Sequence, residues 1–313
     1  MPIDTPPTSA ANDEFEALRP HLLAVGYRLT GTYADAEDLV QEAWIRWAGY
    51  GDTIDNLRAW LTTVVGRLAL DRLRSAQNRR ESYVGQWLPE PVVIGLQADP
   101  GKSDPLNVVV AGEDARFAVM VVLDQLNPDQ RVAFVLHDGF GVPFPEIADV
   151  LGTTAPAARQ LASRARKAVA GAPPPVPADE HNAIAGSLMA ALASGDLAAV
   201  VGLLHPDVTF TGDANRRAPT APRVITGPDK VARFLFGLAR RYGPNWLAGS
   251  ELARINGELG TYTPGAPPVD GFPELNPRIT VMTVRDGKVC ALWDIANPDK
   301  FTGSPLRQDP GQD

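Results

Sequence analysis

A basic segment at residues 159–167 carries side chains that can read nucleic-acid bases. In a major groove, arginine bonds bidentately to guanine and glutamine to adenine. Helical spacing brings four candidates toward one end of a helix: Arg159, Gln160, Ser163 and Arg164. Arg166 and Lys167 follow at positions suited to phosphate contacts. A solvated basic helix face is the alternative interpretation, so the neighbouring elements must decide between the two.

The residues before this segment favour the DNA-reading interpretation. The pattern predicts a short helix over Phe144–Leu151 that is closed by Gly152. A new helix begins near Thr154 or Pro156 and runs to Val169. A short helix, a glycine turn and a basic helix are typical of a helix-turn-helix, whose second helix enters the major groove.

A second basic segment lies at residues 67–80, where five arginines accompany a single acid, Asp71. Such a helix can hold a phosphate backbone, and the loop before it can offer aromatic and amide groups to an unstacked base. In the alternative interpretation, Trp60 is a core residue and the arginines are solvated. The DNA-binding candidates are Tyr50, Asn56, Trp60, Arg67, Arg72, Arg74, Arg79 and Arg80.

The helix predicted over Asp35–Trp47 has an apolar stripe on one face and acids on another. The acids are either ordinary solvated charge or a docking face for a basic partner. Periodicity alone does not decide between the two.

Composition limits the remaining possibilities. The 313-residue chain is 44% hydrophobic with a net charge of −8, so it can bury real cores, and its basic stripes are local. One cysteine forms no internal disulfide and suits a reducing cytoplasm. Four scattered histidines predict no zinc site, and we expect no cofactor. We expect no signal peptide and no membrane span.

The same composition predicts a multidomain chain with two all-α domains, the second bearing the helix-turn-helix, followed by an α+β domain with a late antiparallel sheet. Asp286-Gly287 is a strong hairpin signal in that sheet. The expected parts are a first helical domain (1–81), a connector (82–112), a second helical domain (113–171), a Pro-rich linker (172–178), an α+β domain (179–303) and a tail (304–313).

Several motifs, in this order and spacing, resemble those of group four, extracytoplasmic-function sigma factors of RNA polymerase. Gly26–Gly31 and Asp35–Ala43 are similar to the polymerase-docking helices, and Ala59–Arg74 to the promoter-melting helix. Three further segments resemble the DNA-reading fourth region of the family: Leu126–Arg131, Ile147-Ala148 and Arg164–Lys167.

The resemblance implies promoter DNA and core RNA polymerase, through its β′ clamp and β subunits, as partners. The first domain would bind the β′ clamp helices and capture the melted non-template strand, and the second would read the upstream promoter element as duplex. The connector would thread toward the RNA exit path. The implied polymerase-binding residues are Asp35, Asp38, Leu39, Gln41, Glu42 and Trp47.

Two further motifs resemble those of sigma factors with a SnoaL-like, cone-shaped extension of the NTF2-like fold. They are Trp87-Leu88-Pro89-Glu90-Pro91 in the connector and Asn297-Pro298-Asp299-Lys300 near the C-terminus. The subfamily usually has an acid followed by a glycine triplet, and this chain departs from that pattern with Asp213-Ala214-Asn215-Arg216. We hypothesise that the two motifs pack together and tune activity in place of a separate anti-sigma protein.

Two other classes of function stay open at this point. One is a transcription factor that binds duplex DNA without polymerase. The other is an enzyme fused to a DNA-binding domain, because the SnoaL-like fold includes cyclases and isomerases. The possible acid–base residues of such an enzyme are His205, Asp213, Tyr262 and Asp294. Structural interpretations of these residues are stronger, so we expect no enzyme, and whether the cone takes a small ligand is left open.

Overall fold

The computed structural model describes residues 9–50, 53–80, 83–96, 108–243, 246 and 249–301. The chain forms two compact units. The helical unit contains residues 1–81, 101–115 and 119–172, and the C-terminal unit contains residues 82–100, 116–118 and 173–313. The expected connector, residues 82–112, is therefore divided between the units, while the two predicted helical domains fall into the helical unit except for residues 116–118. The expected tail, 304–313, lies outside the described residues.

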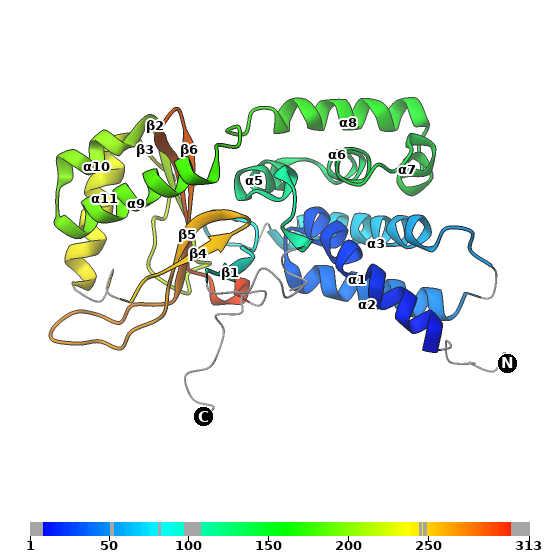
Figure 1. Ribbon diagram of the computed structural model, residues 1–313, viewed down its shortest axis with the longest axis horizontal. Helices are drawn as coiled ribbons and strands as arrows, with labels where there is room; N and C mark the ends of the chain where they lie inside the picture. Colours follow the sequence, from blue (N-terminus) through cyan, green and yellow to red (C-terminus); the bar gives the residue numbers. More distant parts are fainter. Residues whose placement is uncertain are drawn as a thin grey trace. The chain divides into compact units, whose positions relative to one another are not determined.

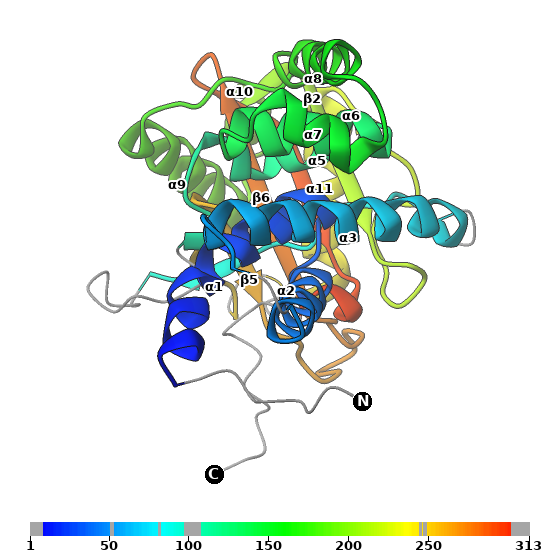
Figure 2. The same cartoon turned by 90° about the vertical axis from the view of Figure 1, so that its right-hand side faces the viewer.

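Helices build the first unit, as the sequence predicted. Helices α1–α3 pack on one another, and so do α6, α7 and α8 (Figures 1 and 2). Their bounds are α1 Ser9–Thr30, α2 Tyr33–Ala48, α3 Leu57–Arg80, α5 Phe117–Gln125, α6 Pro128–Phe134, α7 Phe144–Leu151 and α8 Ala155–Val169. A π-helical turn, Val135–Gly139, follows α6. Among the described residues, none of the helices is both long and apolar enough to cross a membrane.

Local capping groups define where these helices begin and end. The side chains of Thr32, Asn56, Asn127 and Thr154 each accept a hydrogen bond from the backbone N–H three residues later, at 2.8–3.3 Å. Gly152 closes α7 in the left-handed region, with φ of 65°. The predicted helix end at Gly152 is thereby confirmed.

A buried arginine joins α1 to the residues that precede the second helical block. Arg28 is 3% exposed, and its Nε donates to Asp114 Oδ2 at 2.7 Å. Its guanidinium also donates to the carbonyls of Val109, at 2.9 Å, and Ala111. Buried Arg131 in turn donates to the Arg28 carbonyl at 3.0 Å. Because each buried cation has several partners, this charge cluster specifies how the two halves of the unit pack.

His21 makes the helical unit sensitive to acid. Arg58 donates to His21 Nδ1 at 3.1 Å, and His21 Nε2 lies 2.9 Å from Thr62 Oγ1, so the neutral ring fits this site. Burial, followed by the charge of Arg58, lowers the pKa of His21 from 6.5 to about 4. A lowered pKa stabilises the fold above pH 6.5, and that stability is lost as the pH falls toward 4.

We expect the free energy of unfolding to fall by about 1–2 kcal/mol more in the wild type than in His21→Gln between about pH 7 and pH 5. This difference in the free energy of unfolding is smaller than a fully buried histidine would give, because His21 is partly exposed and solvent weakens the electrostatic effect. Urea unfolding of both proteins at each pH measures the difference. Equal acid sensitivity of the two proteins would contradict this account.

The C-terminal unit contains one seven-stranded sheet in the order β1-β4-β5-β6-β7-β2-β3 among its described residues. Strands β2 and β7 pair in parallel, and the other neighbours are antiparallel. The strands are β1 Val93–Gly95, β2 Leu204–Asp213, β3 Ile225–Thr226, β4 Glu251–Ile255, β5 Glu258–Thr263, β6 Arg278–Arg285 and β7 Lys288–Ile295. The helices are α9 Ala178–Ser194, α10 Leu197–Leu203 and α11 Pro228–Tyr242.

Helices α9, α10 and α11 lie on one side of this sheet (Figure 1). Leu188 of α9, Leu235 of α11 and Phe210 of β2 meet in the core between them. The predicted α+β class of this block is therefore confirmed. The predicted Asp286-Gly287 hairpin is also confirmed, with both residues at positive φ between β6 and β7.

Two boundaries in this unit are set by tight changes of chain direction. Helix α10 ends at Leu203, and His205 already lies in β2. Strands β4 and β5 form a hairpin. Asn256 and Gly257 turn the chain at φ of 50° and 86°. Asparagine and glycine tolerate this left-handed region, which is why the pair supports a tight turn.

Candidate nucleic-acid interface and connector latch

Helix α8 presents the six predicted DNA-contacting side chains on its exposed side. Arg159, Gln160, Ser163, Arg164, Arg166 and Lys167 are all exposed. The opposite face consists of Ala158, Ala162 and Ala165, which are buried against the rest of the unit. Small alanines allow close packing of α8, so its polar face is held outward on a rigid support.

Two of these arginines are held by neighbouring side chains. The Arg159 guanidinium lies 4.9 Å from the centre of the Phe144 ring, which stacks on His137 at 3.9 Å. Arg166 makes a bidentate ion pair with Asp138, at 2.8 and 3.0 Å. Both His137 and Asp138 belong to the π-helical turn. This turn therefore supports the start of α8 through a stack of rings and its last turn through an ion pair.

We expect Phe144→Leu to weaken binding to a DNA duplex selected by this protein by about two- to fivefold. A cation–π contact of this kind contributes on the order of 0.5–1 kcal/mol to holding Arg159 in place. Phe144→Tyr keeps the ring and should bind almost as the wild type does. Fluorescence anisotropy of Phe144→Leu, Arg159→Ala and the double variant forms the test, and strictly additive losses would contradict positioning of Arg159 by Phe144.

Ion pairs between α2 and α3 involve residues predicted for two different roles. Arg72, a predicted DNA contact, donates to Asp35 at 2.8 Å and to Asp38 at 3.1 Å, both predicted polymerase contacts. Glu42 pairs with Arg46 at 2.8 Å, one turn later on α2. The structure thus places Arg72 beside the acidic face of α2 and ties it there.

Leu39 is 2% exposed and packs in the core of the helical unit, where it stabilises α2. Its contact with polymerase stays a prediction. Gln41 is exposed on the same helix. Trp47 is partly buried and stacks on Phe15 of α1, with ring centres 5.7 Å apart.

The predicted strand-capture residues lie at both ends of α3. Tyr50 is 45% exposed and packs on the partly buried Trp60, with ring centres 4.9 Å apart, so Trp60 is at most partly a core residue. Asn56 caps the helix. Further along α3, Arg67 is exposed and Arg74 pairs with Asp129 at 3.0 Å. Arg79 and Arg80 end the helix, and their side chains lie outside the described residues.

The two motifs expected to pack together do meet within the C-terminal unit. Lys300 Nζ lies 3.5 Å from the centre of the Trp87 ring, and it donates to the Leu88 carbonyl and to Asp213 Oδ2, the latter at 2.6 Å. Asp213 also accepts from the Leu88 N–H at 2.7 Å and from the Tyr83 hydroxyl. We call this cluster the connector latch: Tyr83, Trp87, Leu88, Asp213, Asn297 and Lys300.

Because the latch is buried, removal of one of its charged partners is costly. Asp213 is fully buried and Lys300 is 3% exposed. A buried carboxylate that loses its cation costs several kcal/mol, because no water replaces the lost partner. Burial, and then the hydrogen bond and charge of Asp213, raise the pKa of the Tyr83 hydroxyl, so this group stays protonated and donates. Asn297 donates to the same hydroxyl at 3.1 Å.

The remaining residues of the Trp87–Pro91 and Asn297–Lys300 motifs differ in burial. Pro89, Glu90 and Pro91 are buried in the C-terminal unit. Pro298 and Asp299 are exposed, and Asp299 pairs with Arg217 at 3.2 Å on the surface. The predicted contact between the two motifs therefore runs through Trp87, Leu88 and Lys300.

The connector also supplies an edge strand, which the sequence analysis missed. Strand β1 pairs with β4 in antiparallel register, and Asn256 exchanges hydrogen bonds with the Val92 backbone at 2.9 and 3.1 Å. Tyr83 was missed as well. The apolar run Val92–Ile94 was a signal for a strand, whereas nothing local marked Tyr83 as the partner of Asp213.

The candidate acid–base residues are distributed among separate contacts. Asp213 belongs to the latch, and His205 bonds to Arg285 at 3.2 Å. Asp294 forms an ion pair with Arg278 at 3.3 Å, while burial raises the pKa of Tyr262. In the part of the chain that the structure describes, no three histidine, cysteine or acidic side chains form a possible metal site.

Comparison with known proteins agrees with this geometry. Residues 15–79 match the family Sigma-70 region 2, and residues 116–169 match Sigma-70, region 4. Two helical regions of this kind, one with a helix-turn-helix, define a sigma factor of RNA polymerase.

Similarity over nearly the whole chain defines the kind of sigma factor more closely. The chain is 66% identical over 298 residues to the ECF RNA polymerase sigma factor SigJ of Mycobacterium tuberculosis, with 94% of each chain covered. The crystal structure of that organism's extracytoplasmic function sigma factor SigJ covers 95% of this chain and 100% of its own, at a TM-score of 0.83 and 65% identity. A putative polyketide cyclase from Xanthomonas campestris resembles 40% of this chain and 95% of its own, at a TM-score of 0.25 and 17% identity.

The chain therefore belongs to the extracytoplasmic-function sigma factors, which are not enzymes and which act in transcription initiation with core RNA polymerase and promoter DNA.

Proposed function

We propose that this sigma factor is regulated by its own C-terminal unit, which holds the connector through the latch. The observation that supports the proposal is the buried Lys300–Asp213 ion pair, which grips the connector at Leu88 and Trp87. Strand β1 adds a second hold, because it is paired to β4. While these contacts persist, the connector is part of the C-terminal fold and is not available to polymerase.

The proposal assigns distinct tasks to the helical elements. Helix α2 docks on the β′ clamp helices through its exposed acids, and α3 captures the melted non-template strand with its arginines. Opening a few base pairs costs on the order of 1.4 kcal/mol per stacking step, and contacts to an unstacked base and its phosphates offset that cost. Helix α8 reads the upstream element as duplex, and tethering both domains to polymerase supplies avidity.

The connector gives this scheme its regulatory step. In the polymerase-bound state it threads toward the RNA exit path, so it must leave β4 and the latch. Binding to polymerase and docking on the C-terminal unit then exclude each other. A chain whose competent state is rarely populated binds its partner with an affinity reduced by that fraction, which is how the C-terminal unit takes the place of a separate anti-sigma protein.

In vitro transcription with purified core polymerase tests the proposal. The full chain is compared with a truncation after Gly171, which removes both Asp213 and Lys300. We expect transcription from a promoter selected by the full chain to change when the latch is removed. Unaltered transcription would overturn the proposed regulation, and failure of the full chain to initiate at any site would overturn the sigma mechanism.

A further inference from the structure

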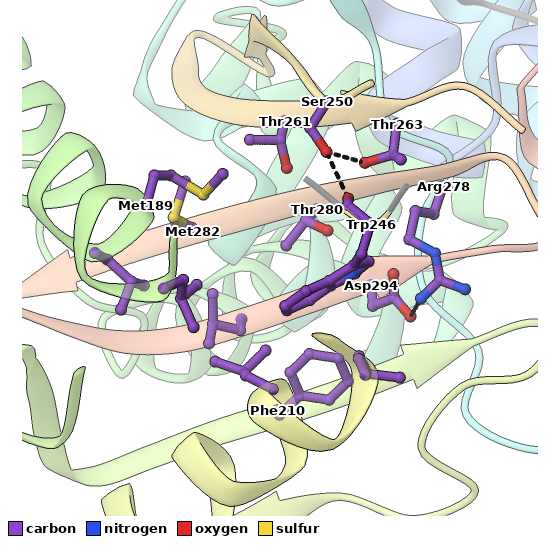
Figure 3. A pocket seen from close by; sticks show the side chains of 15 residues that line it. Met189, Phe210, Trp246, Ser250, Thr261, Thr263, Arg278, Thr280, Met282 and Asp294 are labelled. Carbon is purple, nitrogen blue, oxygen red and sulfur yellow. Dashed lines mark hydrogen bonds and ion pairs between the residues drawn. The ribbon is translucent and has the colours of Figure 1, made fainter. Parts of the chain in front are cut away.

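The C-terminal unit contains a cavity that opens to solvent, and the space not filled by protein atoms there, including solvent at its mouth, is about 540 Å³. Its walls are largely apolar and include Leu188, Leu235 and Leu292. Phe210 and the indole of Trp246 also line it (Figure 3). Known small-molecule sites are concave and mostly apolar, with a few placed polar groups. The cavity has this character, and its polar groups decide what it accepts.

A buried ion pair lies in the wall of the cavity. Arg278 and Asp294 have side chains that are each 2% exposed, and they meet at 3.3 Å through Asp294 Oδ2. Thr220 donates to the same oxygen at 2.6 Å. The other carboxylate oxygen, Oδ1, and Arg278 Nε are buried with no hydrogen-bond partner in the described part of the chain. Buried polar groups are almost always bonded, so this wall offers one acceptor and one donor to an occupant.

The charges select a neutral hydroxyl group. Because Arg278 and Asp294 neutralise each other, an anionic occupant gains little from the cation and is repelled by the open oxygen of Asp294. A hydroxyl both donates and accepts, so it suits Asp294 Oδ1 and Arg278 Nε together. Thr261 and Thr280 add further hydroxyls to the lining (Figure 3). We infer that the cavity binds a neutral, largely apolar aromatic or alicyclic alcohol, and that its occupancy is passed to the connector latch.

The strand that carries Asp294 connects the cavity to the latch. Side chains alternate along a strand, and in β7 Leu292 and Asp294 line the cavity while Trp293 packs on Phe117. In the parallel pairing of β2 with β7, Gly212 is opposite Asp294 and Asp213 is opposite Ile295. An occupant that contacts Asp294 therefore touches the residue opposite Gly212, and the latch carboxylate Asp213 is the next residue of β2. The inferred transmission from the cavity to the latch rests on the proposed regulation, whereas the inferred binding of an alcohol does not.

Isothermal titration of the full chain with 2-naphthol tests the binding clause. Two analogues serve as matched ligands: 2-methoxynaphthalene lacks the donor, and 2-naphthoate is anionic. We expect saturable binding of 2-naphthol and at least about tenfold weaker binding of either analogue, the size expected for one hydrogen bond to a charged group. Absence of saturable binding, or equal binding of the three compounds, would overturn the inference.

Variants of the lining locate the binding. Thr280→Val preserves shape and Asp294→Asn removes the charge, and each should weaken 2-naphthol several-fold. Lys230→Ala, on the exposed side of α11, should leave the affinity unchanged. If Asp294→Asn does not fold, Thr280→Val and the ligand series still decide. Binding that neither lining variant alters would show that the compound occupies another place.

Coupling to the latch is measured without polymerase. Two linked sites change each other's affinity by the same factor, so Lys300→Met should change the affinity for 2-naphthol by a factor of at least about three. Equal affinities would overturn the coupling clause. If transcription responds to Lys300→Met but 2-naphthol does not bind, the cavity inference fails and the proposed regulation stands. If 2-naphthol binds but Lys300→Met does not change transcription, the proposed regulation fails and the cavity inference stands.

Discussion

Replacing Lys300 by methionine is expected to lower the free energy of unfolding of the C-terminal unit by about 3–5 kcal/mol, because it leaves a fully buried carboxylate without its cation. Asp213 is that carboxylate, 2.6 Å from Lys300 Nζ. The same change removes the grip on Leu88 and Trp87 and thus releases the connector. We therefore expect the full-length variant to bind core polymerase about two- to tenfold more tightly than the wild type.

A matched control exists on the surface a few residues away. Arg217 pairs with Asp299 at 3.2 Å, but both side chains are more than half exposed. Exposed pairs of this kind contribute about 0–1 kcal/mol, so Arg217→Met should change neither stability nor polymerase affinity appreciably. Urea unfolding and binding to fluorescent core polymerase measure both variants. A destabilised Lys300→Met chain with wild-type polymerase affinity would show that the latch is structural and not regulatory.

Replacing Arg164 by alanine is expected to weaken binding to a selected promoter duplex by about 10- to 100-fold, the loss of one bidentate base contact. Arg164 suits this role because it is exposed on α8, whereas Arg166 is already paired with Asp138. Binding to unrelated duplex should fall much less, since base contacts carry the sequence information and phosphate contacts do not.

Lys167→Ala is the matched control for this prediction. Lys167 lies in the last turn of α8 and is expected to contact phosphate, so its loss should weaken selected and unrelated duplexes alike. It should also reduce the salt dependence of binding by about one unit of slope. Electrophoretic mobility shifts at several salt concentrations measure both variants. Equal losses on both duplexes for Arg164→Ala would place this arginine on the backbone and not on a base.

Local features of the structure could be predicted because their causes lie within a few residues. Asn127 and Gly152 cap helices through atoms at most one turn away, and Asp286-Gly287 turns a hairpin by its own backbone preferences. The exposed face of α8 follows from helical periodicity, since alanines alternate with polar residues every turn. Interactions of this range are encoded in sequence order.

Other features were missing from the sequence analysis because they depend on what folds against a given side chain. The burial of Leu39 follows from the packing of α2 on its neighbours. Strand β1 exists because residues far along the chain offer it an edge at β4. The ion pair of Arg72 with Asp35 likewise exists only because α2 approaches α3.

By itself, the sequence determined the class of this protein: two helical sigma regions in order, a basic reading helix and a C-terminal α+β unit. Those features rest on periodicity, capping and short motifs, which are local. Only the tertiary structure decided that Asp213 meets Lys300 beside Tyr83, and that Arg278 and Asp294 leave polar atoms open in a cavity. Such contacts join residues distant in sequence, and their energies come from burial, which no stretch of sequence specifies alone.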